Sequence, residues 1–174
     1  MKNANPVSRL LLGLVLLFLS GGCTAREPAA APPKSVTDFF AVRVGDRTVR
    51  MQVAVLGPEM ERGLMGRKDL GADDGMIFVY RAPQRLTFWM HDTPTALDIG
   101  FFNPDGTLAE VYPLLPFDER TVASRSDRLQ FALEMNQNWY RDNGVRPGAG
   151  IDLAALKAAL KARDFDPRKF GLDK

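Results

Sequence analysis

The sequence has 174 residues, of which 45% are hydrophobic and 25% charged, and this composition is typical of a folded globular protein. It excludes a chain that is disordered throughout. The formal net charge is +2, but removal of an N-terminal segment containing Lys2 and Arg9 would reduce the 23 basic residues to 21, equal to the 21 acidic ones. A chain with balanced charge has no global attraction for nucleic acid, so we expect no nucleic-acid partner.

The N-terminal segment predicts export and lipid modification. A basic stretch precedes an apolar run over residues 10–19, which is shorter than the roughly 20 residues that a membrane-spanning helix needs. Two glycines then precede Cys23, and small residues before a cysteine resemble the lipobox of bacterial lipoproteins. We therefore expect a lipoprotein signal peptide over residues 1–22 and a lipid on Cys23, which anchors the protein to a membrane.

Cys23 is the only cysteine, so its lipidation leaves no thiol for a disulfide, a nucleophile or a thiolate metal site. Thr24, rather than aspartate, follows it, as in lipoproteins sorted to the periplasmic face of the outer membrane in a diderm bacterium. Residues 23–36 are rich in Pro and Ala, which is typical of an extended tether. We expect one globular domain over residues 37–174.

Turn residues and apolar runs predict a β-rich domain. The turns at Gly45-Asp46 and Pro104-Asp105-Gly106 separate segments with the alternating or apolar pattern of strands. In chain order, the expected strands cover residues 39–44, 47–56, 76–80, 86–90, 97–103, 107–112 and 129–135.

Three segments predict helices. The first begins at Gly57-Pro58, where proline suits the first turn, and ends at Gly66. A second short helix starts at Asn136 or Asn138, which could cap it, and runs through Arg141. The third is amphipathic and covers Asp152–Arg163. The fold class is therefore α+β, with a mostly antiparallel, barrel-like or sandwich-like sheet, two or three short helices and a C-terminal amphipathic helix.

Several motifs occur in a specific order. The segment ERGLMGR at 61–67 is followed by GMIF at 75–78, FWM at 88–90 and LDI at 97–99. Together they resemble the bacterial and archaeal family known as domain of unknown function 192, over about residues 49–153. The resemblance implies a small exported or membrane-tethered, mostly β domain, and no established reaction. Residues 154–174 are then a C-terminal helical extension.

Five side chains are candidates for a ligand-binding surface: Arg62, Trp89, His91, Asp98 and Glu134. Trp89 alternates with apolar neighbours and faces away from them, unless its strand is buried on both sides. His91 is the only histidine, and the alternative for it is a solvated loop position. Asp98 and Glu134 interrupt apolar strands, where an unpaired buried carboxylate is costly and therefore indicates a functional role. The alternative is that each faces solvent or pairs with Arg62 or Arg67.

We expect a lipid-anchored envelope protein that acts as a ligand-binding or accessory module for a small molecule, a glycan or another protein, without a cofactor. One alternative is a small hydrolase or isomerase that uses His91 with Asp98 or Glu134. A second alternative is soft-metal binding, particularly of copper, by His91 and methionines. The methionines after the signal segment are Met51, Met60, Met65, Met76, Met90 and Met135.

Overall fold

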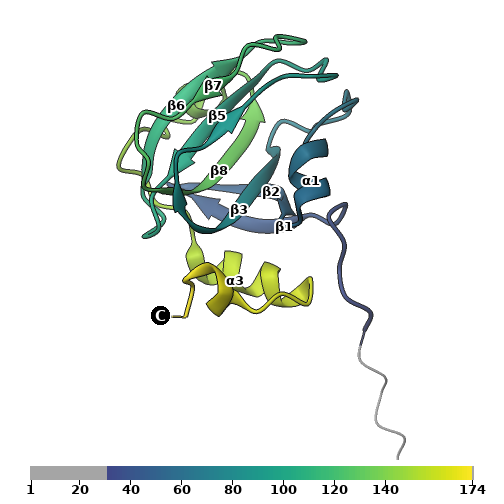
Figure 1. Ribbon diagram of the computed structural model, residues 1–174, viewed down its shortest axis with the longest axis vertical. Helices are drawn as coiled ribbons and strands as arrows, with labels where there is room; N and C mark the ends of the chain where they lie inside the picture. Colours follow the sequence, from purple (N-terminus) through teal and green to yellow (C-terminus); the bar gives the residue numbers. More distant parts are fainter. Residues whose placement is uncertain (1–30, 174) are drawn as a thin grey trace, which may run out of the picture. The chain divides into compact units, whose positions relative to one another are not determined.

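The computed structural model describes residues 31–173, and the predicted signal peptide and Cys23 lie outside this range. A mixed six-stranded sheet and a two-stranded sheet form its framework, together with short helices (Figure 1). The strands are β1 (Phe40–Val44), β2 (Arg47–Ala54), β3 (Asp74–Gln84), β4 (Thr87–Phe88), β5 (Leu97–Phe102), β6 (Leu108–Leu114), β7 (Val122–Ala123) and β8 (Leu129–Asn136). The helices are α1 (Gly57–Arg62), α2 (Trp139–Asp142), α3 (Leu153–Ala162) and the 3-10 helix η1 (Pro167–Phe170).

The large sheet has the strand order β1-β2-β3-β8-β5-β6, and the small sheet pairs β4 with β7. All neighbours are antiparallel except β2 and β3, which are parallel and joined by a crossover that contains α1. The predicted α+β class with a mostly antiparallel sheet is therefore confirmed, although the sequence pattern did not reveal this parallel pair. The sheet is open, since its edge strands β1 and β6 do not pair with each other. Isolated bridges instead join Val44 of β1 to Ile151, and Thr107, just before β6, to Gly150.

Both faces of the large sheet are covered, and strand β8 shows this most directly. Phe131, Leu133 and Met135 point into one apolar core, which also contains α2, α3 and η1. Leu129 and Ala132 point into a second core, on the side of α1 and the small sheet. Because both faces are covered, seven of the eight residues of β8 are buried, as expected for a central strand.

Helix α3 confirms the predicted amphipathic helix. Asp152 caps it, because its carboxylate accepts from the backbone N–H groups of Ala154 and Ala155, both at 3.0 Å. Leu156 and Leu160 lie in the first core, so the C-terminal extension packs on the sheet. Among residues 31–173, no helix is long and apolar enough to span a membrane.

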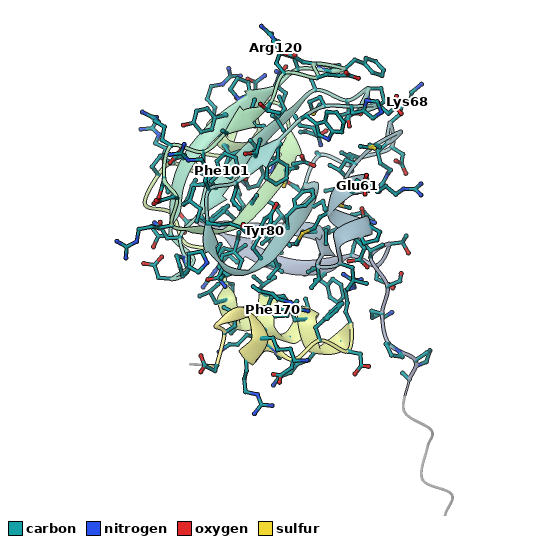
Figure 2. All side chains as sticks on the ribbon, in the orientation of Figure 1. Glu61, Lys68, Tyr80, Phe101, Arg120 and Phe170 are labelled. Atoms are coloured by element: carbon teal, nitrogen blue, oxygen red, sulfur yellow. The ribbon has the colours of Figure 1, made fainter. Side chains whose placement is uncertain are left out.

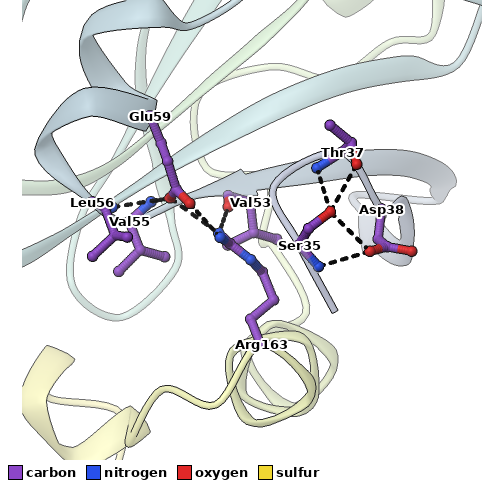
Figure 3. A network of polar contacts seen from close by, with 8 residues as sticks. All are labelled: Ser35, Thr37, Asp38, Val53, Val55, Leu56, Glu59 and Arg163. Carbon is purple, nitrogen blue, oxygen red and sulfur yellow. Dashed lines mark hydrogen bonds and ion pairs between the residues drawn. The ribbon is translucent and has the colours of Figure 1, made fainter. Parts of the chain in front are cut away.

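A buried ion pair joins the end of α3 to α1 (Figure 3). The guanidinium of Arg163 donates to the carboxylate of Glu59 and to the carbonyl oxygen of Val53. Glu59 also accepts from the backbone N–H groups of Val55 and Leu56, at 2.9 and 3.0 Å. Burial alone would raise the pKa of Glu59, but the hydrogen bonds from Arg163 and the two backbone groups lower it.

The predicted tether meets the domain before its expected end. The backbone N–H of Lys34 donates to the carbonyl oxygen of Ala162 at 2.8 Å, and Val36 packs against the second core. Ser35 and Asp38 form a local hydrogen-bonded turn beside this contact (Figure 3). Lys34 is therefore held next to the end of α3.

Three expected elements differ in detail. Helix α1 ends at Gly63 rather than Gly66, because Gly63 has a positive φ of 44° that stops the helix. The strand expected over residues 86–90 is reduced to β4, which pairs with the unpredicted β7. Asn138 precedes α2 in a left-handed conformation, and its side chain makes no capping hydrogen bond.

Candidate functional site

The segment that follows α1 is held against the loop that follows β4. The backbone N–H of Gly66 donates to the carbonyl oxygen of Asp92 at 2.8 Å. The hydroxyl of Thr95 donates to the carbonyl oxygen of Arg67 at 2.7 Å. These two hydrogen bonds bring the ERGLMGR segment at 61–67 next to the FWM segment at 88–90, although the two are more than twenty residues apart in the sequence.

Strand β4 and its flanks alternate as expected. Leu86, Phe88 and Met90 are buried in the second core, whereas Trp89 is 46% exposed. The strand is therefore buried on one side only, and the alternative of a two-sided buried strand is wrong. Trp89 is held at the surface because the residues on both sides of it are fixed in the core.

Trp89 and His91 form a stacked pair. Their ring centroids lie 4.8 Å apart with an interplanar angle of 16°. The Nδ1 atom of His91 lies 2.7 Å from Oε1 of Glu119, and Nε2 lies 3.5 Å from a carboxylate oxygen of Asp92. The hydrogen bond with Glu119 raises the pKa of His91, and the charges of Asp92 and Glu119 also raise it, while desolvation opposes them. His91 is thus a half-exposed, paired histidine rather than a freely solvated one.

This pair borders a groove of about 900 Å³. Phe117 also lines it and is 62% exposed, and its backbone N–H donates to the carbonyl oxygen of Thr93 at 3.1 Å. The groove also receives charged side chains from α1 and the following loop, including Glu61 and Lys68 (Figure 2). The lining residues are Pro58, Glu61, Arg62, Met65, Gly66, Lys68, Trp89, His91, Asp92, Pro94 and Phe117. Exposed aromatic faces beside charges of both signs suit a ligand with apolar and polar parts.

A smaller cavity of about 290 Å³ adjoins the groove, and Glu134 of β8 lines it. Glu134 is only 4% exposed, and its neighbours across β3 and β5 on the same face are Met76 and Ile99. Burial raises the pKa of Glu134 to about 8. The charge of Glu134 and burial together raise the pKa of Tyr80, another cavity residue, to about 12, with burial the larger cause. Glu134 neither faces solvent nor pairs with Arg62 or Arg67, so both alternatives for it are wrong.

Asp98 lies on the other face of the sheet. Its neighbours Leu97 and Ile99 point into the second core, so its own side chain points toward α2. There its carboxylate accepts from the backbone N–H of Asn138 at 2.7 Å. Burial raises the pKa of Asp98, while this hydrogen bond partly offsets the effect. Asp98 therefore fixes the start of α2 and takes no part in the groove or the cavity.

Four of the five predicted residues thus lie around adjoining spaces. Arg62 and Trp89 line both the groove and the cavity, His91 lines only the groove, and Glu134 lines only the cavity. The prediction missed Glu119 and Phe117. Both belong to a polar loop whose approach to His91 no local pattern encodes, although Phe117 is an isolated aromatic residue in that loop.

The methionines serve mainly as core residues. Met51 and Met135 lie in the first core, and Met76 and Met90 in the second. Within the part of the chain that the structure describes, no group of three or more His, Cys, Asp or Glu side chains is arranged to hold a metal ion. The positions of these methionines are explained by packing.

The chain was compared with known families and structures. The profile of domain of unknown function 192, described as an uncharacterized ACR, matches residues 40–153, which confirms the resemblance seen in the motifs. A crystal structure from Sinorhizobium meliloti 1021, named as a candidate transcription regulator, is 28% identical with a TM-score of 0.64, and the match covers 68% of this chain and 96% of that chain. A protein of unknown function from Novosphingobium aromaticivorans DSM 12444 is 30% identical with a TM-score of 0.63, covering 71% and 94% of the two chains. No curated protein matches the chain.

Proposed function

This chain belongs to the uncharacterized domain of unknown function 192 family, and we propose that it is a lipid-anchored envelope protein that binds a ligand in the groove at Trp89. The observation that carries the proposal is the stacked pair of Trp89 and His91 at the border of a groove of about 900 Å³. This volume lies within the roughly 300–1,000 Å³ of small-molecule sites. The exposed faces of Trp89 and Phe117 suit a sugar ring or a peptide side chain.

The geometry favours binding over catalysis by the predicted residues. His91 pairs with Glu119, whereas Asp98 lies on the far face of the sheet and Glu134 lines a cavity that His91 does not line. A general base must reach its partner within hydrogen-bond distance, directly or through a water. The structure therefore lends no support to a hydrolase or isomerase built on His91 with either carboxylate.

Ligand binding can be followed through the fluorescence of Trp89. The chain has two tryptophans, and Trp139→Phe would leave Trp89 as the only indole. The full-length protein in detergent would be titrated with peptidoglycan fragments, oligosaccharides and short peptides. We expect a saturable change in emission with one class, and at least a tenfold weaker affinity in Phe117→Ala. Unchanged emission across all three classes would contradict the proposal.

The lipid anchor is tested separately, because it rests on the sequence around Cys23. Cells expressing the protein would be labelled with radioactive palmitate, and the Cys23→Ser variant would serve as the matched control. We expect label in the wild-type protein alone, and recovery of that protein with outer membranes. Equal labelling of both proteins, or of neither, would contradict anchoring at Cys23.

A further inference from the structure

We infer that the cavity beside the groove binds an alkylammonium group, and that Glu134 releases its proton on binding to become the carboxylate counter-ion. The inference rests on the proposed function, since the group would belong to a ligand that also occupies the Trp89 groove. The groove and the cavity share four lining residues, Glu61, Arg62, Met65 and Trp89, so one ligand can reach both spaces.

The first support is that Glu134 lacks a partner. No hydrogen bond or ion pair reaches its carboxyl from any described residue, and desolvation is the single cause of its shifted pKa. Such a group is costly in an apolar interior, and natural proteins rarely keep one without a role. Its cost is consistent with a site that is completed by a ligand.

The second support is that the Glu134 oxygens are not sealed. Among side chains of residues 31–173, the one fully enclosed polar atom without a partner is Nε of Arg163. The unpartnered oxygens of Glu134 therefore keep access to the cavity that this residue lines. A donor that enters the cavity can reach them without a rearrangement of the sheet.

The walls explain why the donor would be a cation. Aromatic rings from β3 and from β4 and its flank line the cavity, and ring faces attract cations. These residues are Phe78, Tyr80, Phe88 and Trp89. Glu61 and Arg62 line both spaces and their opposite charges offset each other, whereas Lys68 lines the groove and not the cavity. The volume of about 290 Å³ suits one slender alkyl chain rather than a disaccharide.

Methionine methyl groups provide a site-specific measurement. Met60 and Met65 line the cavity, whereas Met51 and Met135 lie in the first core, on the opposite face of the sheet. The full-length protein, labelled with ¹³C at methionine methyl groups, would be titrated in detergent with butylammonium chloride, and with 1-butanol as the neutral control. We expect saturable shifts at Met60 and Met65 with butylammonium only, and unchanged resonances of Met51 and Met135. Equal binding of butanol would overturn the inference, as would the absence of any shift with butylammonium.

The Glu134→Gln variant tests the counter-ion. Gln has the same shape and no charge, so the resonances of Met51 and Met135 should show an unchanged fold. We expect at least a tenfold loss of butylammonium affinity, and retained affinity would overturn the inference. The same methyl shifts are then measured with the peptide Gly-Lys-Gly and, as its control, Gly-Met-Gly. Shifts with Gly-Lys-Gly alone would identify the group as a lysine side chain of a partner, and shifts with butylammonium but neither peptide would identify it as a free amine. Phe117 lines only the groove and Met60 only the cavity. Loss of the Phe117→Ala effect would therefore mark failure of the proposed function, and loss of the Met60 shift would mark failure of the ammonium site.

Discussion

The imidazole of His91 lies nearly parallel to the indole of Trp89, with 4.8 Å between the ring centroids. The carboxylate of Glu119 holds the imidazole by accepting a hydrogen bond from its Nδ1 at 2.7 Å. The indole is thus fixed in orientation although almost half of its surface is exposed. A ligand that stacks on Trp89 need not order this side chain first, which lowers the entropic cost of binding.

The two neighbouring aromatic residues of the FWM segment differ in exposure, since Trp89 lies at the surface and Phe88 in the core. The double variant Trp89→Ala, His91→Ala should abolish the ligand response and leave the thermal transition nearly unchanged, because surface substitutions usually alter the free energy of unfolding by less than about 0.5 kcal/mol. Phe88→Ala is the matched control, since Phe88 is 8% exposed and packs edge-on against Phe78. It should cost about 3–5 kcal/mol. Because the double variant lacks the Trp89 emission, titration calorimetry measures its ligand binding, and scanning calorimetry measures the thermal transition of each variant. A collapse of the double variant would show that Trp89 and His91 are core residues.

Glu119→Gln should lower the pKa of His91 toward its ordinary value. The hydrogen bond that His91 donates to Glu119 is the main cause that raises this pKa, and an amide cannot supply the same negative charge. Chemical shifts of the single imidazole, followed by NMR across neutral pH, give the pKa directly. Asp92→Asn is the control and should have a smaller effect, because Asp92 lies farther away, at 3.5 Å from Nε2. The interpretation fails if both variants titrate like the wild type.

The buried carboxyl of Glu134 should make the protein less stable as pH rises from about 4.5 to about 8. In this window the unfolded chain has ionised the group, whereas the folded protein keeps its proton, so the folded state binds more protons. At 1.36 kcal/mol per pKa unit, the full loss is up to about 5 kcal/mol. Glu134→Gln should remove this part of the pH dependence and be more stable than the wild type at pH 8.

Denaturant unfolding at pH 5 and pH 8 compares the two proteins. Glu110→Gln is a suitable control because hydrogen bonds from the backbone of Arg125 and Ser126 and from Tyr112 lower the pKa of Glu110 despite its partial burial. That variant should lose stability at pH 8 relative to the wild type, opposite in sign to Glu134→Gln. Parallel pH profiles for wild type and Glu134→Gln would show that the carboxyl is not buried in solution.

Arg163→Ala should destabilise the domain by about 3–5 kcal/mol, which is typical when one partner of a buried ion pair is removed. The side chain of Arg163 is 4% exposed, and its loss leaves the carbonyl oxygen of Val53 and part of Glu59 without donors. Arg168→Ala is the control, since its pair with Asp166 lies at the surface and should contribute less than about 1 kcal/mol. Equal midpoints of thermal unfolding for Arg163→Ala and Arg168→Ala would contradict the structural role of the Glu59–Arg163 pair.

Local patterns were sufficient to predict most strands and the C-terminal helix. The β1–β2 hairpin follows from alternation around Gly45-Asp46, and α3 follows from Asp152 and its apolar spacing. The order of the strands could not be derived in this way. The parallel contact between β2 and β3 is decided by how both faces of the sheet are covered, which is a property of the whole chain.

The candidate site was predictable in its residue types and less so in its arrangement. Trp89 and Glu134 stand out because each departs from the apolar pattern of its own segment. Asp98 departs in the same way, yet its partner is the backbone N–H of Asn138, forty residues away. Only the register of β5 and β8 shows that Asp98 and Glu134 point to opposite faces.

The position of β8 also determines when this chain can fold as it emerges from the ribosome with its N-terminus first. β8 lies between β3 and β5, so until residues 129–136 are available the earlier strands form two fragments with an unpaired edge each. The central pairings join segments far apart in the sequence, which slows folding. About three quarters of the polypeptide must therefore emerge before the main sheet can close, so the growing chain lacks its central strand for most of its synthesis.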